Sequence, residues 1–425
     1  MTGGAAAPRR LRLRAGGAQA VAQTLRPEPA AEDLTGAVAA ILDDVRARGD
    51  EALVEHARRF ECPDFAPDRL RVPRVALERA ADEADPELRA AIVAAAAQVR
   101  VVAEALVPDD RHVTLPFGQR VRVRAVPVDS AGVYVPGGRA AYPSSLIMGV
   151  VPAQVAGVPR VAVVSPPGPD GRVARVILAA AALLGVDEVY AAGGAGAVGA
   201  LAFGTATIAP AAVIVGPGSP WVQEAKRQVA GRVGIDGIAG PSEVMIIADA
   251  SADPEALALD LLAQAEHGPD SPAVLASDDP EVVEAVAGAL ERLPGAPGPV
   301  TLVECASMPL AVELAEAFAP EHLEIATRDA DGIADRITRA GAVFVGPNCA
   351  TAFGDYVAGS NHVLPTGGAA RHASALGPGT FLRRMAVVEM TDEAVAALTP
   401  HLAVLATAEG FPMHRRSAEI RGGRG

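Results

Sequence analysis

The feature that most restricts the fold of this chain is an alternation of short apolar runs with longer amphipathic stretches, which occurs in two successive series. The first series has apolar runs at 160–166, 188–192 and 212–215, and the second has them at 243–248, 272–276, 300–303, 323–326 and 342–345. Strands that alternate with helices form parallel sheets with helices on both faces, and ligands bind at the carboxyl ends of such strands. The sequence therefore predicts an α/β fold with two Rossmann-like, doubly wound parallel-sheet domains.

Helical patterns precede and follow these two series. Amphipathic stretches near the start of the chain predict helices, residues 121–128 alternate as a strand does, and a helical tail is predicted beyond Thr391. At 425 residues the chain exceeds the usual size of a single hydrophobic core. We therefore expect a helical N-terminal segment that contributes to the first α/β domain, then two α/β domains and a C-terminal helical tail, with the bounds 1–128, 129–242, 243–385 and 386–425.

The charge of the chain argues against several classes of partner. The formal net charge is −14, and no dense basic patch follows the first residues. Nucleic acid and anionic membranes are therefore not expected as partners, and the ligands are expected to be small molecules. Residues 189–223 carry no charge, but their Gly and Pro residues fit buried strands and turns better than a membrane span.

The cysteines indicate a reducing compartment. Cys62, Cys305 and Cys349 are odd in number and far apart, which predicts reduced thiols in a cytoplasmic protein. The basic residues near the N-terminus are not followed by the apolar core of a signal peptide.

Residues 260–270, DLLAQAEHGPD, form the end of a predicted helix that begins near Asp253 and ends before Gly268. Gln264 and His267 continue its apolar row at helical spacing, so both side chains are carried toward the buried end of the helix. A metal ion is one partner that suits an amide oxygen and an imidazole one turn apart. The alternative is that both side chains bond nearby carbonyl groups at the helix end.

Glycine-rich turns follow predicted strands of the first series. Residues 194–199 read GAGAVG, a spacing typical of dinucleotide-binding turns between a strand and a helix. No Asp or Glu follows about twenty residues later to bind a ribose, so the match can also arise by chance in Ala- and Gly-rich sequence. Further glycine turns at 134–138 and 216–218 predict a cleft at this edge of the sheet.

Histidines beside acidic or amide residues mark the second series and the tail. The side chains concerned are Glu321, His322, Asp355, His362, Glu409 and His414. Taken singly, an adjacent Glu-His pair is usually a solvated turn, and the two residues of the tail fit an exposed helix. Taken together, these groups supply a general base, a second carboxylate and enough ligands for a divalent metal.

Eight ordered motifs resemble the histidinol dehydrogenase family over nearly the whole chain. They are DDVRARGDEAL (43–53), VYVPGGRAAYPSS (133–145), GPGSPWVQEAKRQV (216–229), AGPSE (239–243), DLLAQAEHGPD (260–270), APEHLE (319–324), FGDYVAGSNHVLPT (353–366) and EGFPMHRR (409–416). Such a set is far more specific than a single glycine motif. The resemblance implies NAD-dependent, two-step oxidation of L-histidinol, through L-histidinal, to L-histidine in histidine biosynthesis, by a homodimer with one Zn²⁺ in each site.

The resemblance also implies which residues form the site. Zinc would be held by Gln264, His267, Asp355 and His414, the last supplied by the tail of the partner subunit. The substrate pocket would consist of the same four residues together with Ser242, His322, His362 and Glu409. Domain 129–242 would bind NAD, domain 243–385 the metal and substrate, and the tail would complete the partner's site. His322 would act as general base, and Glu321 would activate the water that hydrates the aldehyde.

The cofactor positions match the family only in part. Tyr134 matches, whereas Gly196 and Ser219 stand where the family usually has Gln and Asn as NAD contacts. Two other interpretations stay open: a related enzyme that oxidises another polar alcohol, such as a sulfonated diol, and a metal-binding homologue without turnover. His362 and Glu409 disfavour the sulfonated substrate, because an anionic group would call for Arg or Lys.

Overall fold

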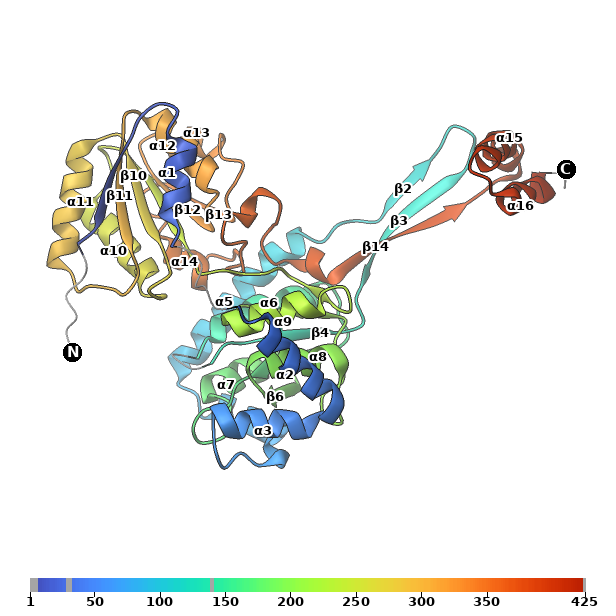
Figure 1. Ribbon diagram of the computed structural model, residues 1–425, viewed down its shortest axis with the longest axis horizontal. Coiled ribbons are helices and arrows are strands. Elements are labelled where there is room, and N and C mark those ends of the chain that lie inside the picture. The colour runs from blue at the N-terminus through green and yellow to red at the C-terminus, as the bar shows by residue number, and fades with distance from the viewer. Residues whose placement is uncertain (1–6, 28–32, 138–140, 423–425) are drawn as a thin grey trace.

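Two α/β units and a slender arm make up the molecule (Figure 1). The structure is a computed structural model that describes residues 7–27, 33–137 and 141–422. The α/β class, the two parallel sheets and the helical tail predicted from the sequence are confirmed. Part of the glycine turn predicted at 134–138 lies outside the described residues.

A five-stranded parallel sheet forms the centre of the first unit, in the order β6-β5-β4-β7-β8. Its strands are β4 (Ala131–Tyr134), β5 (Val161–Ser165), β6 (Glu188–Ala191), β7 (Val213–Val215) and β8 (Gly234–Ile235). The surrounding helices are α2 (Thr35–Arg48), α3 (Asp50–Phe60), η1 (Pro67–Arg69), α4 (Arg74–Asp82), α5 (Pro86–Ala105), α6 (Pro143–Val155), α7 (Arg175–Leu183), α8 (Gly194–Phe203) and α9 (Pro220–Val229). Successive strands leave β4 in opposite directions, so the topological switch point lies between β4 and β7.

A six-stranded parallel sheet forms the centre of the second unit, in the order β1-β11-β10-β9-β12-β13. Its strands are β1 (Arg9–Leu13), β9 (Val244–Ala248), β10 (Ala273–Ser277), β11 (Val300–Cys305), β12 (His322–Ala326) and β13 (Ala342–Val345). Its helices are α1 (Ala18–Leu25), α10 (Pro254–Ala265), α11 (Pro280–Arg292), α12 (Met308–Phe318), α13 (Ala330–Ala334) and α14 (Thr351–Tyr356). The short turn η2 (Ala369–Arg371) follows, and η3 (Pro378–Phe381) packs on α6 of the first unit.

The start of the chain belongs to the second sheet. We expected residues 1–128 to accompany the first unit, but β1 runs parallel to β11, with Leu13 opposite Cys305. The reason is apolar packing: Leu13 and Leu25 are buried in the core cluster formed with α12 and the second sheet. The domain boundaries themselves remain a prediction.

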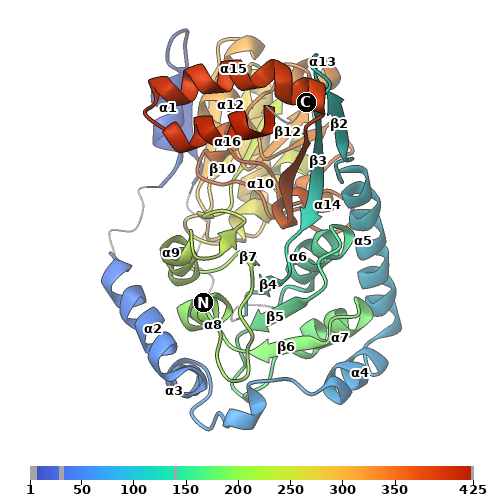
Figure 2. The same ribbon diagram turned by 90° about the vertical axis from the view of Figure 1, so that its right-hand side faces the viewer.

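A separate antiparallel sheet forms the arm. Its strands are β2 (Arg111–Thr114), β3 (Arg120–Pro127) and β14 (Leu382–Glu389), in the order β14-β3-β2. Helices α15 (Asp392–Ala408) and α16 (Pro412–Gly422) pack against each other at its tip, as Figures 1 and 2 show. Strand β14 was not predicted, because almost all of its side chains are exposed in the single chain and no burial pattern marks it.

The described part of the chain contains no helix with both the length and the apolar character needed to cross a bilayer. The uncharged stretch at 189–223 forms most of β6, all of α8 and β7, and the start of α9, all within the first unit.

Candidate active site

His322 is the first residue of β12, and its two ring nitrogens face different surroundings. The Nδ1 atom lies 3.2 Å from the backbone oxygen of Glu243 and donates to that carbonyl, so in the neutral form of the ring Nε2 carries the lone pair. The Nε2 atom is buried, makes no hydrogen bond to the described residues, and lies 3.5 Å from Oδ1 of Asp355. An imidazole held in this tautomer presents an acceptor to the site.

Glu321 is fixed beside His322 by hydrogen bonds from the residues that precede β9. Its Oε2 atom accepts from Oγ of Ser242 at 2.6 Å and from the backbone N–H of Glu243 at 2.9 Å. Oε2 also lies 3.4 Å from Nδ1 of His322. Glu321 is 5% exposed and His322 is 4% exposed, so the pair is not a solvated turn.

The charges of this cluster act strongly on one another. Burial opposes the protonated form of His322, but the neighbouring Glu321 carboxylate, together with Asp355, raises the pKa of His322 to about 10. Burial also opposes ionisation of Asp355, yet the facing His322 ring lowers the pKa of Asp355. The protein alone therefore favours an ion pair between imidazolium and carboxylate.

Asp355 and His362 connect the two α/β units. Asp355 lies in the short helix α14 of the second unit. The Nδ1 atom of His362 is 2.8 Å from the backbone oxygen of Asp355, and its Nε2 atom is 3.3 Å from Oγ of Ser145 in α6 of the first unit. Asn361 donates a second bond across the units, to the backbone oxygen of Met148.

Gln264 lies near the end of α10, and α10 packs against the helix α14 that carries Asp355. The side chain of Gln264 is 4% exposed, and its Nε2 atom has no partner among the described residues. Because the nitrogen and oxygen of an amide are assigned from their surroundings, this orphaned group also fits an oxygen turned toward a cation.

His267 follows α10 and is exposed. Its Nδ1 atom lies 3.2 Å from the backbone oxygen of Gln264, as expected for the alternative of carbonyl bonding at the helix end. Its Nε2 atom is left for another partner, and the imidazole acts electrostatically on Asp355. The described residues of one chain nevertheless bring together no group of three or more His, Cys, Asp or Glu side chains able to hold a metal.

Glu409 and His414 are not near the other candidates in the same chain. Glu409 directly follows α15 and His414 belongs to α16, so both lie at the tip of the arm (Figure 1), and both are exposed. A single chain therefore has an incomplete version of the predicted site.

The residues predicted to contact NAD surround the switch point of the first sheet. Tyr134 ends β4, and its hydroxyl accepts a hydrogen bond from the N–H of Gly194 at 3.2 Å. Ser219 precedes α9 and is exposed. The turn before it is close to β4, since a Cβ atom on Gly216 would lie 2.2 Å from the backbone oxygen of Tyr134.

The GAGAVG motif does not form a loop ahead of a helix, because α8 begins at its first glycine. Gly196 and Gly199 are buried within α8, where added Cβ atoms would lie 2.9 Å from Nδ1 of His56 and 3.1 Å from Leu42. These two glycines therefore permit close packing of α8 on α3 and α2. His56 takes the space beside position 196.

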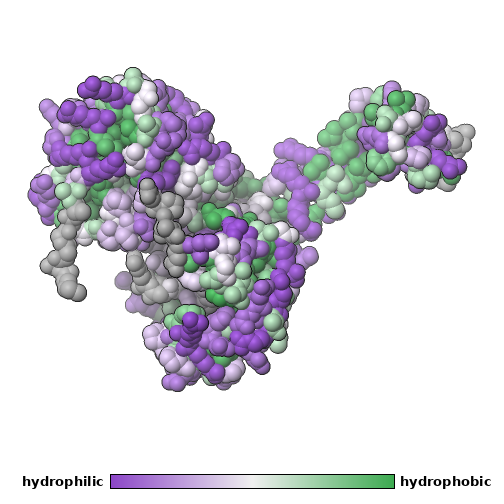
Figure 3. Space-filling view, in the orientation of Figure 1, coloured by the Kyte–Doolittle hydropathy of each residue, from purple (hydrophilic) through white to green (hydrophobic). Residues whose placement is uncertain are grey.

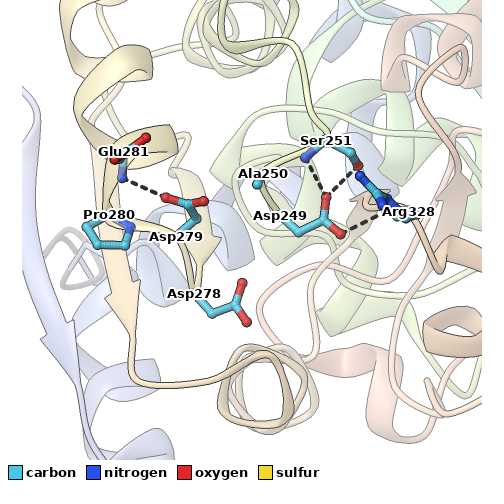
Figure 4. A pocket seen from close by; sticks show the side chains of 8 residues that line it. All are labelled: Asp249, Ala250, Ser251, Asp278, Asp279, Pro280, Glu281 and Arg328. Carbon is cyan, nitrogen blue, oxygen red and sulfur yellow. Dashed lines mark hydrogen bonds between the residues drawn. The ribbon is translucent and has the colours of Figure 1, made fainter.

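The position of the site in the second unit differs from the expectation. His322 begins β12 and Ser242 precedes β9, so the site lies at the amino edge of the second sheet rather than at the carboxyl edge. The carboxyl edge has an open hollow of about 590 Å³, lined by Asp249, Ser251, Asp278, Asp279, Glu281 and Arg328 (Figure 4). Asp249 accepts there from the backbone N–H groups of Ser251 and Arg328, and Asp279 caps α11, so these carboxylates mainly bond to the adjacent backbone.

Sequence reasoning missed Ser145 and Glu243. Glu243 adjoins Ser242 in the AGPSE motif, which was a usable signal for it. Ser145 ends the VYVPGGRAAYPSS motif, but only the fold shows that it faces His362.

Two parallel-sheet units and a buried histidine between carboxylates define an α/β protein with a site suited to acid–base catalysis. The fold alone is shared with an acetylating aldehyde dehydrogenase from Geobacillus thermoglucosidasius, at a TM-score of 0.50 and 15% identity over 89% of this chain and 95% of that one. The family model for histidinol dehydrogenase matches residues 24–422, and the chain belongs to the histidinol dehydrogenase family.

Individual relatives match over almost their full length. The histidinol dehydrogenase of Rhizobium meliloti (strain 1021) is 45% identical over 92% of both chains, and that of Streptomyces avermitilis is 43% identical over 90% of both. The crystal structure of histidinol dehydrogenase from Elizabethkingia anophelis matches with a TM-score of 0.92 and 31% identity, covering 97% of this chain and 98% of that one.

Proposed function

We propose that this chain oxidises L-histidinol through L-histidinal to L-histidine, with NAD as hydride acceptor and one Zn²⁺ in each site. The observation that carries the proposal is the buried pair Glu321 and His322, held by the residues before β9 and facing Asp355. Family membership supports the same substrate, and the comparisons favour neither of the two alternative interpretations.

The proton of the substrate alcohol is accepted by His322. Its Nδ1 atom is committed to the carbonyl of Glu243, so Nε2 is the atom that takes the proton as hydride leaves the carbinol carbon. NAD supplies the hydride-accepting chemistry when bound. The same nitrogen takes a proton again when the hydrated aldehyde is oxidised.

Hydration of the aldehyde is assigned to Glu321. Both hydrogen bonds that it accepts from Ser242 and Glu243 go to Oε2, so Oε1 remains able to accept a proton from water. Burial of the pair keeps bulk water from competing for this carboxylate.

Zinc would be held by Gln264, His267, Asp355 and His414 of the partner subunit. The buried, unpaired amide of Gln264 and the packing of α10 against α14 support this set. A bound Zn²⁺ supplies a positive charge that counters Asp355, which favours the neutral form of His322, and it provides a template for the amino and imidazole groups of the substrate.

We place NAD at the carboxyl edge of the first sheet, between Tyr134 and the turn that leads to Ser219. The crevice at a switch point is where such sheets bind dinucleotides. This edge faces the second unit, because Ser145 of α6 contacts His362. Cofactor and substrate are thereby brought to the same junction.

A homodimer is required if the arm of one subunit is to complete the site of the other. Apolar side chains are exposed at the tip of the arm, with Val404 70% and Leu405 64% exposed, and Figure 3 shows apolar surface on the middle of the arm and in patches at its tip. Large exposed apolar patches mark protein interfaces. Glu409 of the partner subunit would then meet the imidazole or ammonium group of the substrate. The free cysteines accord with a cytoplasmic location.

The test uses purified protein with Zn²⁺, NAD and L-histidinol. We expect about two NADH for each histidine formed, as the two hydride transfers require, and loss of activity on chelation. Turnover of other polar alcohols but not of histidinol would instead support the related enzyme. Inactivity with every alcohol would support the homologue without turnover.

A further inference from the structure

Arg26 reaches the active site from the opposite end of the chain. It follows α1, and its guanidinium donates from Nε to Oε2 and from Nη2 to Oε1 of Glu243, both at 2.7 Å. The Nη2 atom also donates to the backbone oxygen of Phe318 at 2.7 Å. The guanidinium lies 3.8 Å from the centre of the Phe318 ring, so one side chain holds two segments of the second unit together.

Glu243 transmits this contact to both proposed catalytic groups through its backbone. Its N–H donates to Oε2 of Glu321, and its carbonyl accepts from the backbone N–H and from Nδ1 of His322, each at 3.2 Å. The side chain of Glu243 is only 2% exposed. A buried carboxylate needs a paired cation, and Arg26 is the ion-pair partner among the described residues.

The second segment held by Arg26 leads directly to Glu321. Ala319 follows α12 with φ of 51°, the left-handed region that L side chains rarely adopt, and it is the only non-glycine residue with positive φ among those described. Arg26 donates to the carbonyl of Phe318 just before it and lies 3.4 Å from the carbonyl of Ala319 itself. Arg26 therefore stabilises both the strained turn and, through Glu243, the catalytic pair.

We propose that Arg26 is a positioning residue for the oxidation of histidinol. Through Glu243 and the turn at Ala319, Arg26 fixes the positions of Glu321 and His322 relative to each other. It touches neither of the two groups directly. Glu243 orients the imidazole tautomer and the carboxylate from one side, while the turn at Ala319 sets where the backbone of Glu321 begins. The inference rests on the proposed function, because it says that the positions of Glu321 and His322 affect the rate of histidinol oxidation.

The test is steady-state kinetics of Arg26→Ala in the full-length, zinc-loaded protein. We expect kcat to fall by roughly 10- to 100-fold, as a displacement of about 1 Å in a catalytic group costs, with KM for NAD unchanged because the cofactor crevice lies in the other unit. Arg26 is partly exposed, so guanidinium at concentrations far below those that unfold the protein should restore part of kcat, whereas sodium chloride should not.

The matched control is Arg12→Ala in the same N-terminal segment. Arg12 pairs with Glu304 on the surface and does not contact the catalytic region, so its kcat should equal that of the wild type. A folded Arg26→Ala protein with wild-type kcat, or a loss that guanidinium does not restore, would overturn the inference.

If Arg26→Ala does not fold, the inference is tested with Arg26→Lys, because lysine keeps the positive charge but lacks the planar, two-pronged guanidinium group. A lower kcat at normal thermal stability then supports the inference, and an unchanged kcat overturns it. A wild-type protein that does not oxidise histidinol would instead remove the proposed function itself, so the two failures are distinguishable.

Discussion

Burial and neighbouring charges give the two ring nitrogens of His322 different roles. Its Nδ1 atom is occupied by the carbonyl of Glu243, and its Nε2 atom points to Asp355 without a hydrogen bond. An imidazole bonded only to water has no such fixed difference between its nitrogens, because water can bond to either of them.

Replacement of His322 by Ala should lower kcat by roughly 10² to 10⁴, the range for loss of a general base. The measurement is NADH formation with saturating histidinol and NAD. His372→Ala is the matched control, since His372 is exposed and lies outside the site. An unaffected rate in the His322 variant would remove its assigned role.

Glu61 gives a prediction about stability and pH. Glu61 directly follows α3, its carboxyl group lies beside Gly193 of the first unit, and burial raises its pKa to about 7. Since the pKa of an unfolded Glu is about 4.3, the folded state binds more protons between these values, and its free energy of unfolding falls as pH rises through the interval.

Replacing Glu61 by Gln removes this dependence. We expect the Tm of Glu61→Gln, relative to wild type, to increase between about pH 4 and pH 8, in keeping with the raised pKa. Thermal unfolding followed by circular dichroism over this range measures it. A difference in Tm that stays constant with pH would contradict the assignment.

At the scale of elements, the turn between β7 and α9 is held by buried polar groups. The N–H of Gly216 donates to Asp236, and Nζ of Lys226 donates to the carbonyl of Gly216. Gly216 has φ of 114°, and its open side faces the backbone of Tyr134. The turn and β4 can approach this closely only because position 216 lacks a side chain.

Gly216→Ala should therefore destabilise the protein and weaken NAD binding. Backbone strain of this kind costs about 1–3 kcal/mol, and the collision with Tyr134 adds to it. Gly231→Ala separates backbone strain from collision. Gly231 also has positive φ, at 92°, but no atom lies within 4 Å of an added Cβ. Urea unfolding and KM for NAD should both show the larger change in Gly216→Ala.

Elements with a strong local pattern could be predicted from the sequence. Helix α10 begins where Asp253 and Pro254 indicate, and the Asp253 side chain accepts from the N–H of Glu255 as a cap does. The parallel strands were found because burial on both faces makes them continuously apolar.

Features that depend on distant contacts could not be predicted from the pattern. Gly196 and Gly199 of α8 match a phosphate-binding spacing but permit close helix packing, since the same absence of a side chain suits both. The site lies at the amino edge of the second sheet because that edge meets the first unit, and Ser145 faces His362 only through this junction. No local signal links Arg26 to Glu243, 217 positions away.

At the scale of the whole molecule, the arm separates Glu409 and His414 from the site of their own chain (Figure 1). If two subunits exchange arms, each site draws on both chains, and defects in different chains can complement each other. A site contained within one chain would not allow this.

Mixing inactive His322→Ala and His414→Ala proteins, after dissociation and reassociation, should restore activity. About half of the dimers are then mixed and one of their two sites is intact, so we expect recovery to about a quarter of the wild-type rate. Activity that stays at the level of the separate variants, although mixed dimers are present by mass spectrometry, would refute the shared site.

The pairing of β1 with β11 also fixes an order of assembly. Arg12 and Glu304, which join these strands, are 292 positions apart, and the entire first unit is encoded between them. During translation the first unit can therefore fold before β11, the partner of the N-terminal strand β1, has left the ribosome. A fusion or truncation at the N-terminus would accordingly disturb the folding of the second unit, which is synthesised last.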